Sequence, residues 1–324
     1  MVPQLRAFSG SGQKRVFGHL AAGVAMIFWG STFAVSKIIL EAGVSPLEML
    51  IGRFALAWIM LQFIPCAKLG FAGWRREVPF ILAALGGVTI YFLFENTALE
   101  LTYASNVGMI TGTAPLFVGL TFWLVYRERP NKWFFIGGAV AVFGVFCVAQ
   151  NGAQMNMNPL GDFLAILACV AWCLYTIGMR KIKQMPGEKD DIAITRRIFF
   201  WGVVTSCLII PFSGTADFLR IGTSLDVWLT FDVLGSLIYL AIFASCLCYI
   251  FNGFALRVLG EVSASAYIYT IPAISLITSL ILLGEPVTAL GVVGLVAITV
   301  GLLVSEEFWK RWVKSKKKRQ KSET

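Results

Sequence analysis

Long apolar stretches, separated by short polar segments, run through most of the chain. A helix needs roughly 20 residues to cross a hydrocarbon core of about 30 Å, and a window of that length finds ten such stretches. They are continuously apolar and do not alternate with polar residues, so they predict helices and not the strands of a barrel. We place them at 17–40, 46–67, 78–101, 103–126, 131–150, 159–182, 192–212, 232–257, 261–283 and 287–306.

The composition fits this pattern. Of the 324 residues, 57% are hydrophobic and 14% are charged, a balance outside the range of soluble globular domains. We therefore expect an all-α integral membrane protein that passes through the bilayer several times. The first apolar stretch is full length and follows a polar segment, so we expect it to remain as a helix and not to be removed as a signal peptide.

Positive charges predict the orientation of these helices. If residues 1–16 form a cytoplasmic N-terminal segment, most of the 27 Lys and Arg residues fall on the cytoplasmic side, and Lys37 and Arg220 are the exceptions outside the membrane core. Both termini are then cytoplasmic. Residues 307–324 form a basic tail, which we interpret as facing anionic lipid and not nucleic acid. This tail accounts for much of the net charge of +9.

The chain contains an internal repeat. The segment from Gly18 aligns without gaps on the segment from Gly161, which pairs Trp29 with Trp172, and a later block aligns at a spacing of 157 residues. The repeats are 17–150 and 159–306, with five helices each. Because five is odd, the second repeat enters the membrane from the opposite side, and a pseudo-two-fold axis lies in the membrane plane. Two such halves can alternate between outward-open and inward-open states around one central site.

Several short motifs follow one another along the repeated stretches. They are "RF" in the second stretch, "ENTAL" in the third, "TAPLF" followed by "RERP" in the fourth, and "TIPAISLITSLILLGEPVT" in the ninth. Together they resemble the ten-helix, EamA-type branch of the drug/metabolite transporter superfamily. The resemblance implies secondary transport of amino acids, related metabolites or drugs, often as export, and a bacterial inner membrane. It does not fix the substrate.

Glu95 lies inside an apolar stretch, where a carboxylate costs about 2.5 to 3.5 kcal/mol. Arg53 in the preceding stretch has a similar depth, about 10 Å below the outer surface at 1.5 Å per residue, so we predict a pairing that is direct or runs through water or substrate. The counterpart of Glu95 in the second repeat is Asn252. Glu95 could bind a substrate ammonium, carry a coupled proton, or form a structural salt bridge.

Two prolines and a group of polar and aromatic residues complete the candidate binding site. Pro115 and Pro272 lie midway along their stretches and are predicted to bend them as hinges. The predicted cavity lining, in addition to Glu95 and Arg53, is Trp29, Tyr91, Asn96, Thr111, Thr113, Trp172, Tyr175, Tyr249, Asn252, Tyr267, Tyr269 and Thr270. Each aromatic residue taken alone also fits ordinary packing against lipid or core.

Three charged residues are predicted to be structural. Glu128 and Glu285 stand at equivalent positions after the fourth and ninth stretches, where they could cap the helix that follows. Arg196 is the counterpart of Arg53 near the inner surface. Gly137, Gly144, Gly294 and Gly301 permit close contact between the fifth and tenth helices.

Motifs for catalysis are missing from the sequence. It has no GxxxxGK[ST] phosphate loop, no HExxH and no metal-ligand cluster, and the seven cysteines form no CxxC pair. We therefore expect no enzyme activity and no cofactor, with solute or ion gradients as the driving force. The alternatives to a metabolite transporter are a nucleotide-sugar or sugar-phosphate exchanger of the same superfamily, and a non-transporting scaffold or lipid-handling protein. The oligomeric state stays open.

Overall fold

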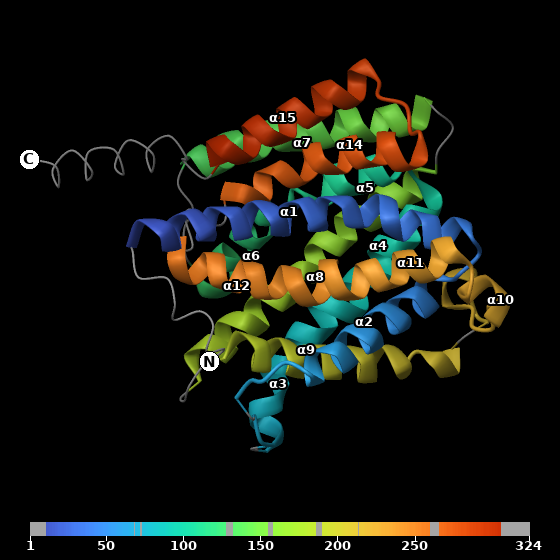
Figure 1. The fold of residues 1–324 in the computed structure, drawn as a ribbon. Coiled ribbons are helices and arrows are strands. Elements are labelled where there is room, and N and C mark those ends of the chain that lie inside the picture. Colours follow the sequence, from blue (N-terminus) through green and yellow to red (C-terminus); the bar gives the residue numbers. More distant parts are fainter. Residues whose placement is uncertain are drawn as a thin grey trace, which may run out of the picture.

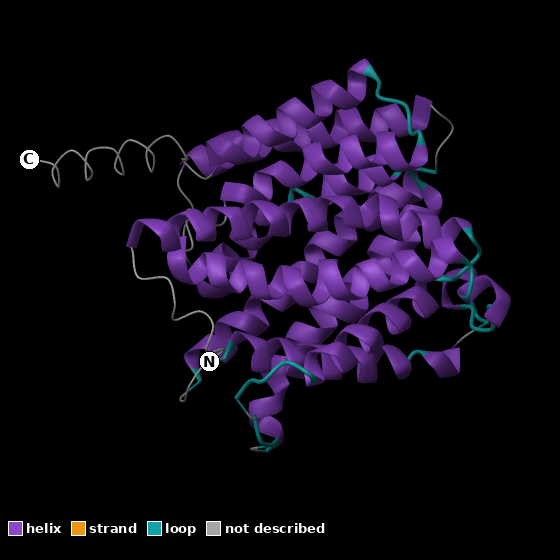
Figure 2. Cartoon of the chain, in the orientation of Figure 1, coloured by secondary structure: helices purple, strands orange, loops and turns teal. Residues whose placement is uncertain are grey.

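The computed structural model describes residues 11–67, 69–71, 73–127, 132–154, 158–185, 190–212, 214–259 and 266–305. In this part of the chain all regular structure is helical, and short loops join the helices (Figure 2). The N-terminal segment 1–10 and the basic tail from 306 onward lie outside the described residues.

Each predicted apolar stretch falls on one helix or on a run of consecutive helices. The first half contains α1 (Ser11–Glu41), α2 (Pro46–Gln62), α3 (Trp74–Ala84), η2 (Leu85–Thr89), α4 (Ile90–Leu101), α5 (Ala104–Thr111), α6 (Ala114–Tyr126) and α7 (Lys132–Gln154). The second half contains α8 (Pro159–Gln184), α9 (Asp191–Cys207), η3 (Ile210–Phe212), η4 (Asp217–Leu219), α10 (Leu225–Trp228), α11 (Phe231–Tyr239), η5 (Leu240–Leu247), α12 (Cys248–Leu259), η6 (Ala266–Thr270), α14 (Ile271–Leu283) and α15 (Ala289–Ser305).

Six helical segments among the described residues are long and apolar enough to cross a membrane, and further apolar helices are shorter. Together with the all-helical architecture they support an integral membrane protein. The number of ten crossings and the cytoplasmic position of both ends stay predictions.

The helix ends follow from local sequence. Ser45 caps α2, because its hydroxyl accepts from the Glu48 backbone while the Glu48 carboxylate accepts from the Ser45 backbone, and Pro46 occupies the first turn. The predicted stretch 46–67 is too long, since α2 ends at Gln62. Pro65 cannot continue a helix. The Arg196 guanidinium donates hydrogen bonds to the carbonyl oxygens of Leu61 and Ile64, at 2.7 and 2.6 Å, at the end of α2.

The third predicted stretch and its counterpart in the second half are not uniform α-helices. The first is interrupted by the π-helix η2, the second by the π-helix η5, and residues 85–89 correspond to 242–246 at the repeat spacing. π-Helical turns are rare, and those that occur are often found at functional sites. Their recurrence at equivalent positions shows that the repeat extends to an irregular backbone feature.

The contact between α7 and α15 shows how the two halves are related. A Cβ built on Gly144 would lie 2.8 Å from the Gly294 carbonyl oxygen, and one on Gly301 would lie 2.6 Å from the Gly137 carbonyl oxygen. At the repeat spacing of 157, Gly137 corresponds to Gly294 and Gly144 to Gly301, so the contact 137–301 is equivalent to the contact 144–294. These two contacts require α7 and α15 to run antiparallel. The two halves are therefore related by a pseudo-two-fold axis across the helices, as the inverted repeat predicts, and the predicted close glycine contact is confirmed.

The helices form a bundle with α7 and α15 paired at one edge and α2 and α9 paired at the opposite edge (Figure 1). Between them α1 contacts α12 and α14, and α8 contacts α4, α5 and α6. Buried rings fill the side near α2, where Phe54 lies 4.9 Å from Phe92 and 5.1 Å from Phe199 between ring centroids. Helices of both halves therefore alternate around the centre of the bundle.

Candidate functional site

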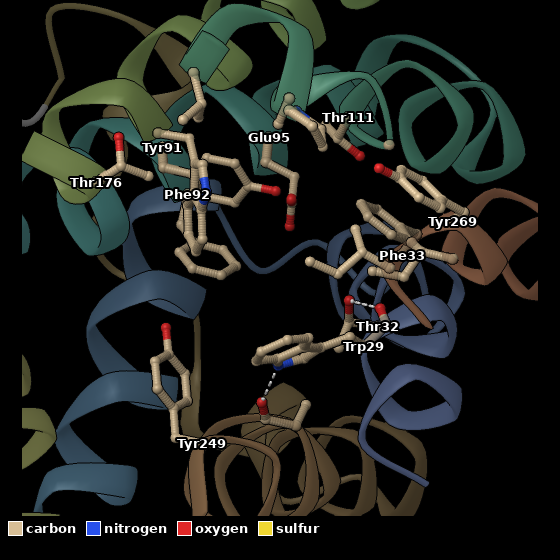
Figure 3. Close-up of a pocket in the computed structure, with 18 of the residues that line it drawn as sticks. Trp29, Thr32, Phe33, Tyr91, Phe92, Glu95, Thr111, Thr176, Tyr249 and Tyr269 are labelled. Carbon is tan, nitrogen blue, oxygen red and sulfur yellow. Dashed lines mark hydrogen bonds between the residues drawn. The ribbon is translucent and has the colours of Figure 1, made fainter. Parts of the chain in front are cut away.

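A cavity of about 700 Å³ lies at the centre of the bundle, between helices of the two halves. Its wall combines a few polar side chains with many aromatic and aliphatic ones (Figure 3). The residues predicted from the sequence that line it are Trp29, Arg53, Tyr91, Glu95, Thr111, Pro115, Trp172, Tyr249 and Tyr269.

Glu95 stands on α4 with only 2% of its surface exposed, and its carboxylate points into the cavity in Figure 3. The Tyr91 side chain, one helical turn earlier, interacts with this carboxylate. The Oε1 atom has no hydrogen-bond partner among the described residues. Buried polar atoms are nearly always paired, so water or a ligand is the remaining partner for this oxygen.

Arg53 on α2 is 4% exposed and lines the same cavity. Its Nε donates to the Ser245 hydroxyl at 3.0 Å, and its guanidinium carbon lies 4.5 Å from the centre of the Phe92 ring, a cation–π geometry. Nη1 has no hydrogen-bond partner in the described part of the chain. The guanidinium is thus held from one side and leaves hydrogen-bonding capacity unused.

The predicted Glu95 to Arg53 pairing is not a direct contact. The two side chains interact electrostatically. However, the ion pairs found within 4.0 Å among the described residues do not include them. Two opposite buried charges on one cavity wall, each with an unused polar atom, can bind a molecule that carries both an ammonium and an acidic group.

The two halves pack aromatic side chains against each other on the cavity wall. The Trp29 ring contacts Tyr249 edge to face at 5.8 Å, and its counterpart Trp172 contacts Tyr91 at 5.2 Å. The Trp29 indole nitrogen also donates to the Ala244 carbonyl at 3.0 Å, within the π-helix η5. Each half therefore supplies a Trp that packs on a Tyr of the other half.

Several predicted lining residues are placed elsewhere, because other polar groups hold them. The Asn96 amide donates to the Pro46 carbonyl at 3.2 Å, the Thr113 hydroxyl to the Ile110 carbonyl, and the Thr270 hydroxyl to the Tyr267 carbonyl. The Tyr267 hydroxyl bonds His19 at 2.9 Å. The residues outside the lining are Asn96, Thr113, Tyr175, Asn252, Tyr267 and Thr270.

Tyr175 illustrates why helical position alone misleads. Its ring lies against Gly87, where an added Cβ would meet it at 2.5 Å, and it packs on Trp172 at 4.4 Å. It supports the cavity wall from behind. Its neighbour Thr176 reaches the cavity instead.

The prolines mark interruptions, not bends within continuous helices. Pro115 lies in the first turn of α6 after a break at Gly112 and Thr113, and Pro272 lies in the first turn of α14 after the 3-10 helix η6. Gly112 is required at the break because an added Cβ would lie 2.5 Å from Pro272. Pro115 lines the cavity, and Pro272 packs behind it. The role of both as hinges stays a prediction.

Glu285 does not cap α15, the helix that follows it. Its carboxylate accepts instead from the backbone nitrogens of Ala104 and Ser105 at 2.7 and 3.0 Å, at the start of α5. A carboxylate stabilises any helix N-terminus that it reaches, and here the nearest belongs to the other half. Glu128 lies outside the described residues, and Arg196 holds the end of α2.

The sequence prediction missed the apolar and small lining residues. They carry no charge, and only their place on the helix faces beside the predicted lining residues could have indicated them. These residues are Thr32, Phe33, Phe54, Phe92, Gly112, Ala114, Val118, Gly119, Phe122, Thr176, Ala244, Ile268 and Ile271.

Two inverted helical halves around a central cavity with buried charges are typical of membrane transporters. The EamA-like transporter family model matches the chain twice, over residues 16–150 and 159–305. The chain belongs to this family, within the drug/metabolite transporter superfamily, which confirms the resemblance in the sequence.

Individual relatives agree with this assignment. An uncharacterized transporter of Archaeoglobus fulgidus is 26% identical over 272 residues, which cover 82% of this chain and 89% of the relative. The uncharacterized transporter YetK of Bacillus subtilis is 24% identical over 302 residues, covering 90% and 88%. A solved crystal structure with 16% identity matches with a TM-score of 0.57 over 91% of this chain and 98% of the other, which shows a shared fold.

Proposed function

We propose that this protein is a secondary transporter of amino acids or closely related zwitterionic metabolites, which it moves by alternating access around the central cavity. In this proposal Glu95 binds the ammonium group of the substrate and Arg53 binds its acidic group. The proposed site of action is the bacterial inner membrane, with export as the expected direction.

One observation supports this proposal above the others. Glu95 and Arg53 are almost fully buried on the wall of one cavity, and each retains an unpaired polar atom. An uncompensated charge inside a membrane protein is costly, so such side chains are kept where a substrate or ion can satisfy them. The aromatic and aliphatic remainder of the wall accommodates the apolar part of the substrate.

A polyanionic substrate, as in a sugar-phosphate exchanger, is less well supported. Arg53 is the basic residue among those that line the cavity. Arg196 holds the carbonyls of Leu61 and Ile64, and Arg197 forms an ion pair with Glu77 at 2.5 Å. Phosphate recognition needs several convergent donors, and this lining offers few.

The test is counterflow of labelled amino acids in proteoliposomes, with and without a pH gradient. Replacing Glu95 by Gln keeps an acceptor oxygen but removes the negative charge that faces the substrate ammonium. Hydrogen bonds to charged groups are worth about 1.5 to 3 kcal/mol, so we expect counterflow to fall roughly 10- to 100-fold. The matched control is Glu100→Gln, since Glu100 is exposed on the same helix. Its counterflow is expected to equal that of the wild type.

The two versions of the Glu95 role give different results. If the carboxylate binds the substrate ammonium, Glu95→Gln loses counterflow in both conditions. If it carries the coupled proton, the variant still exchanges substrate but no longer responds to the pH gradient. Unchanged flux in both conditions overturns both roles, and a folded wild type without counterflow across the amino acids favours a non-transporting membrane protein.

A further inference from the structure

We propose that Glu285, Lys37 and the start of α5 form a latch that closes one end of the cavity, and that the latch must open before substrate can pass at that end. The inference rests on the proposed transport function. It assigns a conformational role to buried charged residues outside the binding site.

Glu285 is the centre of the latch. It is 6% exposed and accepts three hydrogen bonds from the start of α5, two from backbone nitrogens and one from the Ser105 hydroxyl at 2.6 Å. Its second contact is an ion pair with the Lys37 Nζ at 3.7 Å. A carboxylate at a helix N-terminus is stabilised by both the free N–H groups and the helix dipole.

Lys37 extends the latch to a third and a fourth segment. Its Nζ donates to the Thr102 carbonyl at 2.6 Å, and the Thr102 hydroxyl donates to Asp162 at 3.1 Å. The Asn106 amide reaches the same Asp162 oxygen at 3.5 Å. The network thus joins α1 and the α4–α5 turn of the first half to α8 and the end of α14 in the second half.

The cavity lies away from the latch along every one of these segments. On α5 and α6 the lining runs from Thr111 to Phe122, whereas the latch holds Ser105. On α8 the lining includes Trp172 and Thr176, whereas Asp162 lies at the start of the helix. The cavity therefore extends toward the opposite end of the bundle, to the left in Figure 1, and the latch closes the right-hand end.

The equivalent cation at that opposite end packs against aromatic rings. Arg180 is the counterpart of Lys37, and its guanidinium lies 4.1 Å from the centre of the Tyr126 ring and 5.1 Å from that of Phe122. Phe122 belongs to the cavity lining. A cation therefore stands at the equivalent position of each half, and at this end it lies beside the cavity.

Accessibility of a reporter cysteine tests the latch. The reporter is Thr111→Cys, which lies on the cavity wall, in a background where the partly exposed Cys66 and Cys207 are replaced by Ser. A membrane-impermeant maleimide is applied to right-side-out and to inside-out vesicles, without substrate. With the latch intact, we expect labelling from one side only.

Breaking the latch should open the second side. In Lys37→Met and in Glu285→Gln we expect the labelling rate from the latch side to rise roughly tenfold, which corresponds to about 1.4 kcal/mol. Glu41→Gln is the matched control, because Glu41 is exposed at the end of α1, and its labelling should equal that of the parent. Ser105→Ala removes a single contact and should give a smaller rise in the same direction.

The outcomes separate this inference from the proposed function. Unchanged labelling from the latch side in the charge variants overturns the latch, whether or not amino acids are transported. A rise in labelling together with an absence of amino acid counterflow supports the latch and overturns the proposed substrate. If the charge variants do not fold, Ser105→Ala decides, and a labelling rate equal to the parent's counts against the latch.

Discussion

The segments α3–η2–α4 and α11–η5–α12 occupy equivalent positions in the two halves, and both contain a π-helix in the same place. Their side chains toward the cavity differ. The first supplies Tyr91, Phe92 and Glu95, whereas the second supplies Ala244 and Tyr249, and Asn252 at the position of Glu95 does not reach the cavity.

This difference separates two requirements of the molecule. Inverted halves need matching backbones so that each can adopt the arrangement of the other, and this requirement preserves irregular features as well as helices. A substrate with distinct ends needs an asymmetric wall, and the charged side chains provide it. The comparison therefore predicts that changes to the backbone contacts act equally in both halves, while changes to the wall act in only one.

The largest effect is expected from making the first half resemble the second. Glu95→Asn removes the buried carboxylate, so we expect counterflow to fall roughly 10- to 100-fold, because a hydrogen bond to a charged group is worth about 1.5 to 3 kcal/mol. Counterflow in proteoliposomes measures it. Transport retained in this variant would mean that the asymmetry at this position has no role in the substrate site.

The contact between α7 and α15 should show the opposite, symmetric behaviour. Gly144→Leu and Gly301→Leu each place a side chain against the facing backbone, so we expect both to destabilise the protein by about 1 to 3 kcal/mol or more. Thermal unfolding of the purified protein in detergent measures the change. Gly138→Leu is the control, since its nearest neighbour is Leu116 Cδ2 at 3.9 Å. If the two variants lose clearly different amounts of stability, the two halves do not contribute equally to the contact between α7 and α15.

Ser245 gives an intermediate test, because its counterpart is Val88 and only the second half can hold Arg53 in this way. We expect Ser245→Ala to raise the substrate KM about three- to tenfold with little change in the maximal rate, as the guanidinium loses an orienting acceptor. Ser245→Thr keeps the hydroxyl and should restore the lower KM. Equal KM values for all three proteins would remove the positioning role.

The smallest effect is expected at Asn252. It does not line the cavity, so Asn252→Ala should leave counterflow within about twofold of the wild type, in the range of ordinary substitutions away from special features. A loss similar to that of Glu95→Asn would show that both halves contribute polar groups to substrate binding, and the contrast between them would fail.

The apolar pattern and the repeat spacing are sufficient to predict the helical fold, because membrane crossing fixes length and polarity strongly. Glu95 and Arg53 were identifiable since charges are rare in such helices. Tyr175, Asn96 and Thr113 could not be placed, because one residue of rotation decides whether a side chain meets the cavity or a neighbouring backbone. The interruptions in the helices were also beyond prediction, apart from the prolines that mark two of them.

The π-helix η2 has a consequence for how this segment tolerates change in length. Each residue advances an α-helix by about 100°, so the extra residue of a π-turn alters the angular phase between α3 and α4 by about that amount. Deleting one residue from Leu85–Thr89 would leave the segment helical and apolar, yet it would turn Glu95 away from the cavity or α3 away from its neighbours. The hydropathy of the segment would not reveal this loss of function, because the deletion leaves its apolar pattern almost unchanged.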